Sequence, residues 1–242
     1  MTFMTFMTVT SYAATTANDL SSHIPTQASD GGIALMGTRI VYDADSVHAS
    51  INIRNRSTKD KFLVQSWVEN EKGDKSSDFF VAPPIYVSQP ETQNSVNIKF
   101  IGESSKLPTD RESLYYFVEK TIPSIDKEKI LGKDTVLVAV ATKIKLFYRP
   151  SGLKASQSQA NEMLNVLSEN GDVKLKNASP YYLTLVSVNI NGKKVKDFMV
   201  APFSTYDTGI KKSVNSSQVK YYLLNDFGSK VGPFEKESGI GP

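Results

Sequence analysis

The stretch at residues 135–150 constrains the fold of this chain more than any other segment. It reads TVLVAVATKIKLFYRP, and its first half is apolar on both faces of an extended strand. Val136, Val138 and Val140 point to one side, while Leu137 and Ala139 point to the other. A half-buried strand alternates apolar with polar residues, so this pattern predicts a strand that is buried on both sides.

The second half of the same stretch brings cations in among apolar residues. These cations are Lys143, Lys145 and Arg149. Two structures fit such a strand: a central core strand with a charged end, or an edge strand whose outer face is kept for a partner. A long apolar edge promotes aggregation unless it is covered or used. The stretch alone leaves both interpretations open.

Composition favours β-structure in a chain long enough for two domains. The 242 residues are 40% hydrophobic, which is ordinary for a globular protein. Valine, isoleucine, threonine, tyrosine and phenylalanine recur throughout, and these residues favour strands. The length allows two all-β domains of roughly 100 residues each, or one larger sandwich.

The charged and metal-binding residue types exclude several function classes. The net charge is +3 with scattered lysines, and no aromatic-plus-basic motif points to a nucleic-acid partner. The absence of cysteine excludes disulfides and thiol catalysis. His23 and His48 lack ligand-like spacing, so no metal site is expected.

The first 30 residues are expected to lie outside the fold. They begin MTFMTFMTVTSYAA, and the small residues around Tyr12 resemble a secretory cleavage site. The basic start of such a signal is missing, which leaves a truncated signal, a mispredicted start or a disordered leader as interpretations. Residues 15–30 are expected to form an unstructured spacer.

Strand patterns begin at residue 31 and are separated by turn-forming residues. The spacing of the strands predicts an immunoglobulin-like sandwich over residues 31–150. Trp67 lies in the third strand, where such sandwiches often bury a tryptophan. The expected strands are 33–42, 48–54, 62–69, 79–81, 95–100, 114–119 and 135–149.

A second, smaller β-domain is expected over residues 151–242. The sequence RPSG at 149–152 breaks the strand pattern and predicts the boundary. Residues 157–164 fit a short helical turn, and Asn170-Gly171 and Asn191-Gly192 are hairpin signals. The expected strands are 173–176, 182–189, 194–200 and 220–224. The fold class is therefore all-β, with two consecutive sandwiches.

No catalytic residues are expected. The sequence lacks the common motifs for serine hydrolysis, zinc proteolysis, phosphate binding and dinucleotide binding. Asp110 and Glu112 are close in sequence, but Arg111 lies between them, and a solvated turn or salt bridge explains them better than acid–base catalysis. Neither an enzyme nor a cofactor is predicted.

Several motifs in order resemble the periplasmic chaperones of the chaperone–usher pilus pathway, the PapD-like family. The longest are LPTDRESL at 107–114, followed by Ile122-Pro123, and TKIKLFYRP at 142–150. GTRIVY at 37–42 resembles the family's first strand. Shorter motifs stand at 82–84, 179–182, 201–203 and 225–228, so that the resemblance covers residues 33–235.

This resemblance implies a boomerang of two immunoglobulin-like domains with a cleft between them, in the periplasm of a Gram-negative bacterium. Such chaperones bind pilus or fimbrial subunits that lack one strand, and deliver them to an outer-membrane usher. The chaperone lends its edge strand, here about residues 135–146; chaperone–pilin complementation is a known case of β-strand addition. Self-association of the free chaperone through that edge is also open.

The resemblance also assigns site residues. Ile130, Val136, Val138 and Val140 would enter the subunit groove, while Leu137 and Ala139 would face the chaperone's own core. Arg39 and Lys145 align with the pair of cations that binds the subunit's terminal carboxylate, and both suit an anion chemically. An interdomain ion network is implied for Glu112, Arg149 and Asp226.

Two features depart from the family's pattern. Val118 and Glu119 replace an asparagine and an aliphatic residue, and the segment at 124–134 is longer than in the short-loop members. The long-loop members usually carry a cysteine pair that this chain lacks, so the subclass stays open, as does the cis or trans state of the Ala82–Pro83 bond. The alternative function is a two-domain adhesin or receptor-type binding protein.

Overall fold

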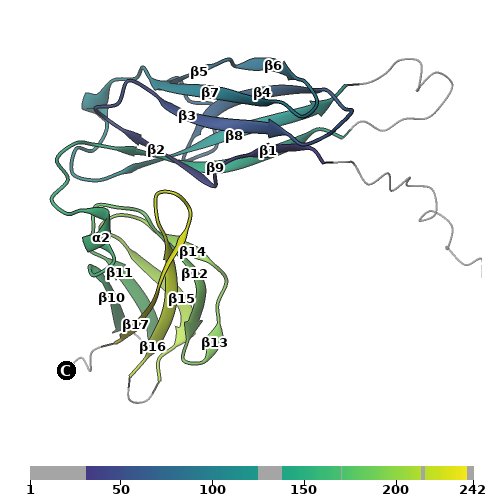
Figure 1. The fold of residues 1–242 in the computed structure, drawn as a ribbon. Helices are drawn as coiled ribbons and strands as arrows, with labels where there is room; N and C mark the ends of the chain where they lie inside the picture. The colour runs from purple at the N-terminus through teal and green to yellow at the C-terminus, as the bar shows by residue number, and fades with distance from the viewer. Residues whose placement is uncertain (1–30, 125–137, 170, 214–215, 239–242) are drawn as a thin grey trace, which may run out of the picture.

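Two β-sandwiches follow one another along the chain, as the strand patterns predicted. The computed structural model describes residues 31–124, 138–169, 171–213 and 216–238. The two sandwiches are set at a steep angle to each other and meet near the end of the first (Figure 1). In the described ranges, no helix is long and apolar enough to cross a membrane.

The first sandwich packs a four-stranded sheet on a five-stranded one. The four-stranded sheet has the order β1 (Ile33–Leu35), β3 (Ala49–Asn55), β7 (Gln93–Phe100) and β5 (Phe79–Ala82). The five-stranded sheet has the order β2 (Arg39–Asp43), β9 (Val140–Arg149), β8 (Ser113–Pro123), β4 (Phe62–Asn70) and β6 (Ile85–Ser88). Alternate residues of the long strands fill the core between the sheets, among them Ile53, Val64, Ile98, Phe117 and Leu146.

The expected single strand at 33–42 is wrong, because the chain changes sheet within it. β1 pairs with β3 in one sheet, and β2 pairs in parallel with β9 in the other. A bend at Met36 to Thr38 separates the two strands. Each half alone has strand-forming residues, so the local pattern does not reveal that the partners differ. Because the chain changes sheet at this bend, Arg39 is the first residue of β2.

Proline and turn signals concealed one strand of the first sandwich. β6 pairs with β4 directly after Pro83 and Pro84, and no strand was expected between residues 82 and 94. The Ala82–Pro83 bond is cis. β8 also runs further than expected, through Pro123, because its pairing with β4 continues to Phe62.

The second sandwich has a three-stranded sheet facing a larger one. The first has the order β10 (Leu164–Glu169), β11 (Asp172–Asn177) and β15 (Thr205–Lys211). The second has the order β13 (Lys193–Lys194), β12 (Leu183–Ile190), β16 (Gln218–Leu224) and β17 (Lys230–Glu237), with β14 (Phe198–Val200) also paired to β12. Its core includes Leu164, Leu175, Leu185, Val219 and Tyr221.

Local signals in this sandwich were partly correct. α2 (Gln157–Ala160) is a single helical turn capped by Ser156, but Leu164 already begins β10. The expected strand at 194–200 is two short strands. Asn191 and Gly192 both have positive φ, at 51° and 80°, and join β12 to β13 as a tight hairpin. Asn170 lies outside the described residues.

Candidate functional site

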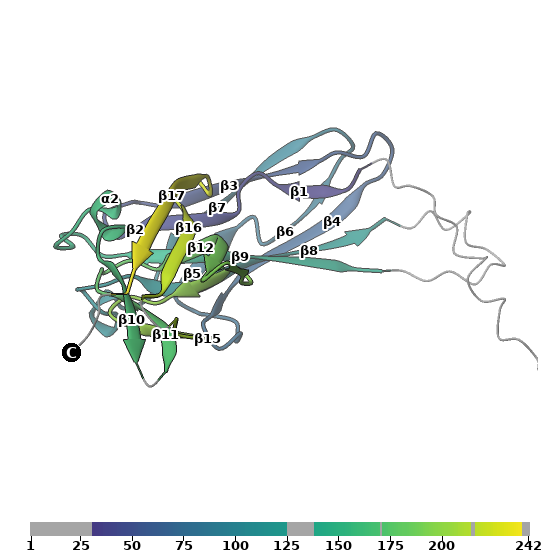
Figure 2. The same cartoon turned by 90° about the horizontal axis from the view of Figure 1, so that it is seen from below.

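One side of β9 lacks a partner over half of its length. β8 pairs with β9 from Val140 to Tyr148. On the other side, β2 pairs only from Lys145 to Arg149. Between Val140 and Ile144 that edge therefore has no strand partner among the described residues. Figure 2 shows β9 at the border of its sheet along this stretch.

Val140 lies on the core-facing side of β9, and Val138, just before the strand, lines the same groove; both lie past the packed core. The exposed fractions of Val138 and Val140 are 63% and 59%, whereas Leu146, on the same side of β9 as Val140, is fully buried. Both valines line a groove of about 420 Å³ at the open end of the first sandwich. Its other lining residues come from both sheets and include Ile33, Phe62, Thr121 and Thr142. An apolar row therefore faces open space there.

The expectation that Ala139 faces the chaperone's own core is wrong. Ile144 and Leu146 pack in or against the core, and counting back by twos leads to Val140 and Val138. Ala139 has the opposite parity and is exposed. The valines thus share a face with the core residues of β9. Ile130, Val136 and Leu137 lie outside the described residues.

Arg39 and Lys145 lie side by side at the point where the pairing of β2 with β9 begins. They are direct partners in the parallel register. Arg39 is buried, its Nη1 donates to the carbonyl of Leu224 at 3.3 Å, and its guanidinium lies 5.9 Å from the Phe147 ring centre. Its Nε is buried without a hydrogen-bond partner.

Lys145 reaches toward the second sandwich. Its Nζ donates to Thr184 Oγ1 at 3.2 Å. Burial, together with the neighbouring charge of Arg39, lowers the pKa of Lys145 to about 8. Burial likewise lowers the pKa of Arg39, which Asp226 and Glu112 oppose. Among the described residues no carboxylate forms an ion pair with either cation, so both retain donors for an anion.

Arg149 joins the two sandwiches through two carboxylates. Its Nε donates to Glu112 Oε1 at 2.9 Å. Its two terminal nitrogens donate to the two carboxylate oxygens of Asp226, each at 2.8 Å. The structure therefore brings together the three residues that the resemblance had grouped.

Other groups complete this network and were not foreseen from the sequence. The backbone N–H of Tyr182 donates to Glu112 Oε2 at 2.8 Å, and Gln157 Nε2 donates to Asp226 Oδ1 at 2.7 Å. Arg149 also lies 5.0 Å from the ring centre of Tyr181. Burial raises the pKa of Glu112, and the charge of Arg149 opposes that rise. In the sequence, the SPYY motif at 179–182 marked the two tyrosines of this set, and Gln157 had no such signal.

The turn between β16 and β17 lies against Thr38, the residue before β2. Gly228 has a φ of 77° and lies against Thr38, and a Cβ atom at that position would overlap the Thr38 hydroxyl. Asp226, which binds Arg149, lies two residues before this glycine. A glycine is therefore needed there for both conformation and space.

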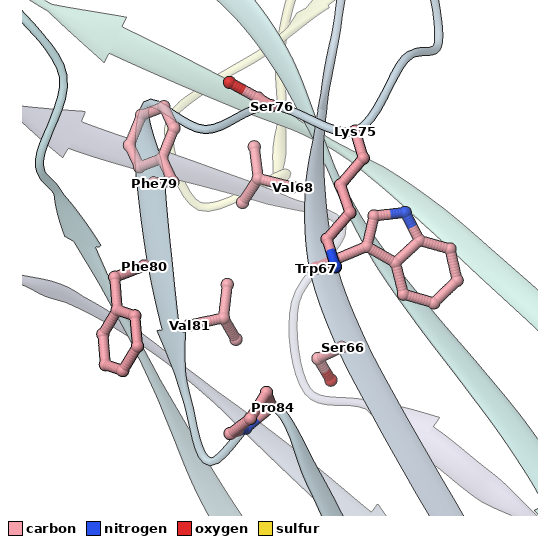
Figure 3. Close-up of a pocket in the computed structure, with 9 residues that line it drawn as sticks. All are labelled: Ser66, Trp67, Val68, Lys75, Ser76, Phe79, Phe80, Val81 and Pro84. Atoms are coloured by element: carbon pink, nitrogen blue, oxygen red, sulfur yellow. The ribbon is translucent and has the colours of Figure 1, made fainter.

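Trp67 is not a core residue. Its neighbours Ser66 and Val68 point inward, while Trp67 is half-buried on the outer face and donates from Nε1 to Glu69 at 2.9 Å. Trp67 lines a hollow of about 230 Å³ between β4 and β5 (Figure 3). The aromatic core is instead built from Tyr42, Phe79, Phe100, Tyr115 and Tyr148.

The titratable side chains of the described residues lack the arrangement that a metal ion requires. Within the described ranges, no group of three or more histidine, aspartate or glutamate side chains is placed to hold a metal ion. The carboxylates near Arg149 are occupied by hydrogen bonds. The site presents an open strand edge and two neighbouring cations.

Comparisons with known proteins agree with this geometry. Residues 32–154 match the family described as pili and flagellar-assembly chaperone, PapD N-terminal domain, and residues 159–233 match the PapD C-terminal domain. The probable fimbrial chaperone SfmC of Escherichia coli K12 is 37% identical over 199 residues, covering 82% of this chain and 85% of SfmC.

Solved structures give the same result. The periplasmic chaperone SfaE superposes with a TM-score of 0.71 at 28% identity, covering 86% of this chain and 98% of SfaE. The Escherichia coli chaperone DraB gives a TM-score of 0.72 at 26% identity, covering 87% of this chain and 97% of DraB. Both domains, the curated relatives and the solved structures thus agree: the chain belongs to the PapD-like family of pilus assembly chaperones.

Proposed function

We propose that this chain binds pilus or fimbrial subunits in the periplasm, lends β9 to their incomplete fold and delivers them to an outer-membrane usher. The observation that carries this proposal is the half-covered β9, whose open edge ends at two cations without a carboxylate partner among the described residues. Membership of a chaperone family leaves no support for the adhesin or receptor alternative. No catalytic step is part of the proposal.

The open edge determines where a guest strand would lie. β2 already occupies the same side of β9 from Lys145 onward, in the parallel direction. A guest strand beside Val140 to Ile144 would continue the line of β2. If it also ran parallel, its last residue would stop where β2 starts. That point is the site of Arg39 and Lys145.

A terminal carboxylate is the group that best fits this point. A chain end that stops against β2 presents two carboxylate oxygens, and the guanidinium and ammonium groups supply charged N–H donors. Hydrogen bonds to charged groups contribute on the order of 1.5–3 kcal/mol each. The ammonium of Lys145 also regains the charge stabilisation that burial removes.

The valine row would supply the apolar part of the affinity. Val138 and Val140 are more than half exposed beside a groove, so a guest would remove that area from water. Complete burial of a valine contributes up to about 1.5 kcal/mol. Register is enforced because a slip by one residue turns the opposite face inward. By the same argument Ile130 and Val136 would extend the row.

The ion network around Arg149 would hold the two domains at the angle that keeps the cleft usable. We assign residues 31–150 and 151–242 to the two domains and residues 1–30 to the leader and spacer. The network contacts both domains through a single guanidinium. Such partly buried networks specify orientation more reliably than they add stability.

The test is recovery of a chaperone–subunit complex. The chain would be co-expressed in the periplasm with the fimbrial subunit encoded nearest to its gene, and complexes would be purified through a tag on the chain. We expect Arg39→Ala and Lys145→Ala to abolish recovery while the free proteins stay folded. Lys99→Ala, on an exposed strand residue of the other sheet, is the matched control and should leave the yield unchanged. Undiminished yield with both cleft variants would refute the proposal.

A further inference from the structure

A buried polar row crosses the core side of the five-stranded sheet. Glu119 of β8 pairs with Ser66 of β4 on one side and with Thr142 of β9 on the other. Only 2% of Glu119 is exposed, and it has the parity of the core residues Tyr115 and Phe117. An ionisable side chain therefore replaces an apolar one inside the first sandwich.

The hydrogen-bonding capacity of this row is not used up by the chain. A carboxylate can accept about four hydrogen bonds. Within the described residues, the one donor to Glu119 is the hydroxyl of Thr121. The Ser66 and Tyr86 hydroxyls are buried nearby without partners. Burial accordingly raises the pKa of Glu119, opposed by the Thr121 hydrogen bond. Leaving a buried polar group unsatisfied costs about 1–3 kcal/mol.

The row lies at the inner end of the groove beside the valines. Thr121 stands two residues after Glu119 on the same face, and Thr142 is the cross-strand neighbour of Glu119. Both threonines line the groove together with Val138 and Val140. A side chain that enters between the valines and passes these threonines is directed toward Glu119, which neighbours both on the core side of the sheet.

We propose that Glu119 selects guests that carry a lysine or arginine side chain at the inward position level with Thr142. This inference rests on the proposed function, because it concerns the guest strand that would pair with β9. The recognised chemistry is a cationic N–H donor: it supplies the hydrogen bonds that Glu119 lacks and neutralises its charge. An apolar side chain there would leave the carboxyl desolvated and without a further partner.

Charge complementarity favours this occupant over other side chains. The groove lining is apolar or hydroxyl-bearing, so Glu119 is the ionisable group behind it in the described part of the chain. The nearest cation along β9, Lys143, has the opposite parity and pairs with Glu69 on the outer face. Within the described residues no cation of the first sandwich pairs with Glu119.

The probes are synthetic strands of about ten residues with alternating apolar side chains and a free terminal carboxylate. One set carries a single lysine at each inward-facing position in turn; the matched set carries norleucine there. Scanning the position removes any dependence on register. Affinities for the folded full chain would be measured by fluorescence anisotropy or calorimetry.

We expect one lysine position to bind the wild-type protein about tenfold more tightly than its norleucine match, because the added hydrogen bonds are charged. Glu119→Gln should reduce that preference strongly, and Glu119→Val should abolish or reverse it. Glu103→Gln, on an exposed loop residue, is the control and should keep the preference. Thermal unfolding would verify that every variant is folded.

Two outcomes separate this inference from the proposed function. Tight binding of both peptide sets without a lysine preference, or a preference that persists in Glu119→Val, overturns the role of Glu119 alone. The carboxyl is then satisfied by this chain itself. Failure of both peptide sets to bind the wild-type protein overturns the proposed function, and this inference with it. So does binding that Lys145→Ala leaves unchanged.

Discussion

Lys145 holds its ammonium group in an unfavourable place. It lies between two domains beside a second cation, and its ammonium donates a hydrogen bond to a neutral hydroxyl, that of Thr184. A bound carboxylate would repair this unfavourable environment. The free protein therefore keeps a cationic site in a state that an anion stabilises.

This environment predicts a pH-dependent affinity. The pKa of Lys145 in the free fold is about 8, so its charge is fully present below that pH and is lost as pH rises through it. Binding of a peptide with a free terminal carboxylate should weaken progressively between about pH 7.5 and pH 9.5. Calorimetry across this range measures the effect.

Two controls isolate the titrating group. Lys145→Arg should flatten the profile, since a guanidinium stays protonated throughout the range. A peptide capped as an amide should bind weakly at every pH. A wild-type profile that stays flat up to about pH 9.5 would contradict the role of Lys145.

At this scale the sequence revealed some partners and hid others. The family resemblance placed Glu112, Arg149 and Asp226 in one group, because each falls on a motif of the family. It did not reveal the Tyr182 N–H or Gln157, since a backbone donor has no residue-type signature and both contacts depend on how the domains meet. Glu119 was noticed as a departure, but its lack of donors is a property of its neighbours.

β9 combines two functions along one strand. From Lys145 to Arg149 it is an internal strand of its sheet, and before that it is an edge. The expectation that the apolar first half is buried on both sides is wrong for its described residues, because Val138, Ala139 and Val140 are exposed. That part of the stretch lies at an edge, where Val138 and Val140 line a groove, whereas the second half is an internal strand.

The exposed half of β9 gives a sharp mutational prediction. Val138→Asp should reduce subunit or peptide binding by at least about tenfold, because it puts a charge into an apolar groove. Since Val138 is 63% exposed, the free energy of unfolding should change by no more than about 0.5 kcal/mol. Denaturant titration and anisotropy measure the two quantities.

Ala139→Asp is the matched control for this strand. Ala139 is exposed on the opposite face, so the same charge one residue away should leave most of the binding intact. Equal losses in the two variants would show that the side of the strand is irrelevant. A large loss of stability in Val138→Asp would instead identify a core residue.

Element prediction failed where pairing, and not local pattern, decides the structure. The segment at 33–42 looks like one strand, yet its halves join different sheets. β15 and β17 were not expected, because they contain few apolar residues. Each strand half-buries one face and leaves the other exposed to solvent. β10 was concealed by the helical turn just before it.

The two domains form one working unit only if their relative angle is maintained. The sequence predicted two sandwiches, but the bend followed from the family resemblance alone. Few residues make the interdomain contacts, and side-chain pairs of this kind leave no periodic signal. Besides Arg149, the stacking of Phe147 on Tyr182 at 5.5 Å contributes to the junction.

Removing one carboxylate should loosen this junction. Asp226→Ala deletes both hydrogen bonds from the terminal nitrogens of Arg149 and the bond from Gln157. We expect a broader distribution of interdomain distances, measured by double electron–electron resonance between spin labels. The yield of complex should fall severalfold. The loss of interdomain stabilisation should be about 1–3 kcal/mol.

Asp43→Asn is the matched control for the junction. Asp43 lies 4.0 Å from the same guanidinium and its side chain is 61% exposed, so its pairing contributes little. An unchanged distance distribution in Asp226→Ala would contradict the assigned role. A collapse of either domain in that variant would show that the network supports the fold itself.

The packing of Gly228 on Thr38 has a mechanical consequence for the whole molecule. The two domains touch there with no room to spare, so even one methyl group would force them apart beside the proposed carboxylate site. The spacing between the domains therefore depends on the absence of a side chain at position 228. A larger residue there would shift the surroundings of Arg39 without changing any residue proposed to contact the bound subunit.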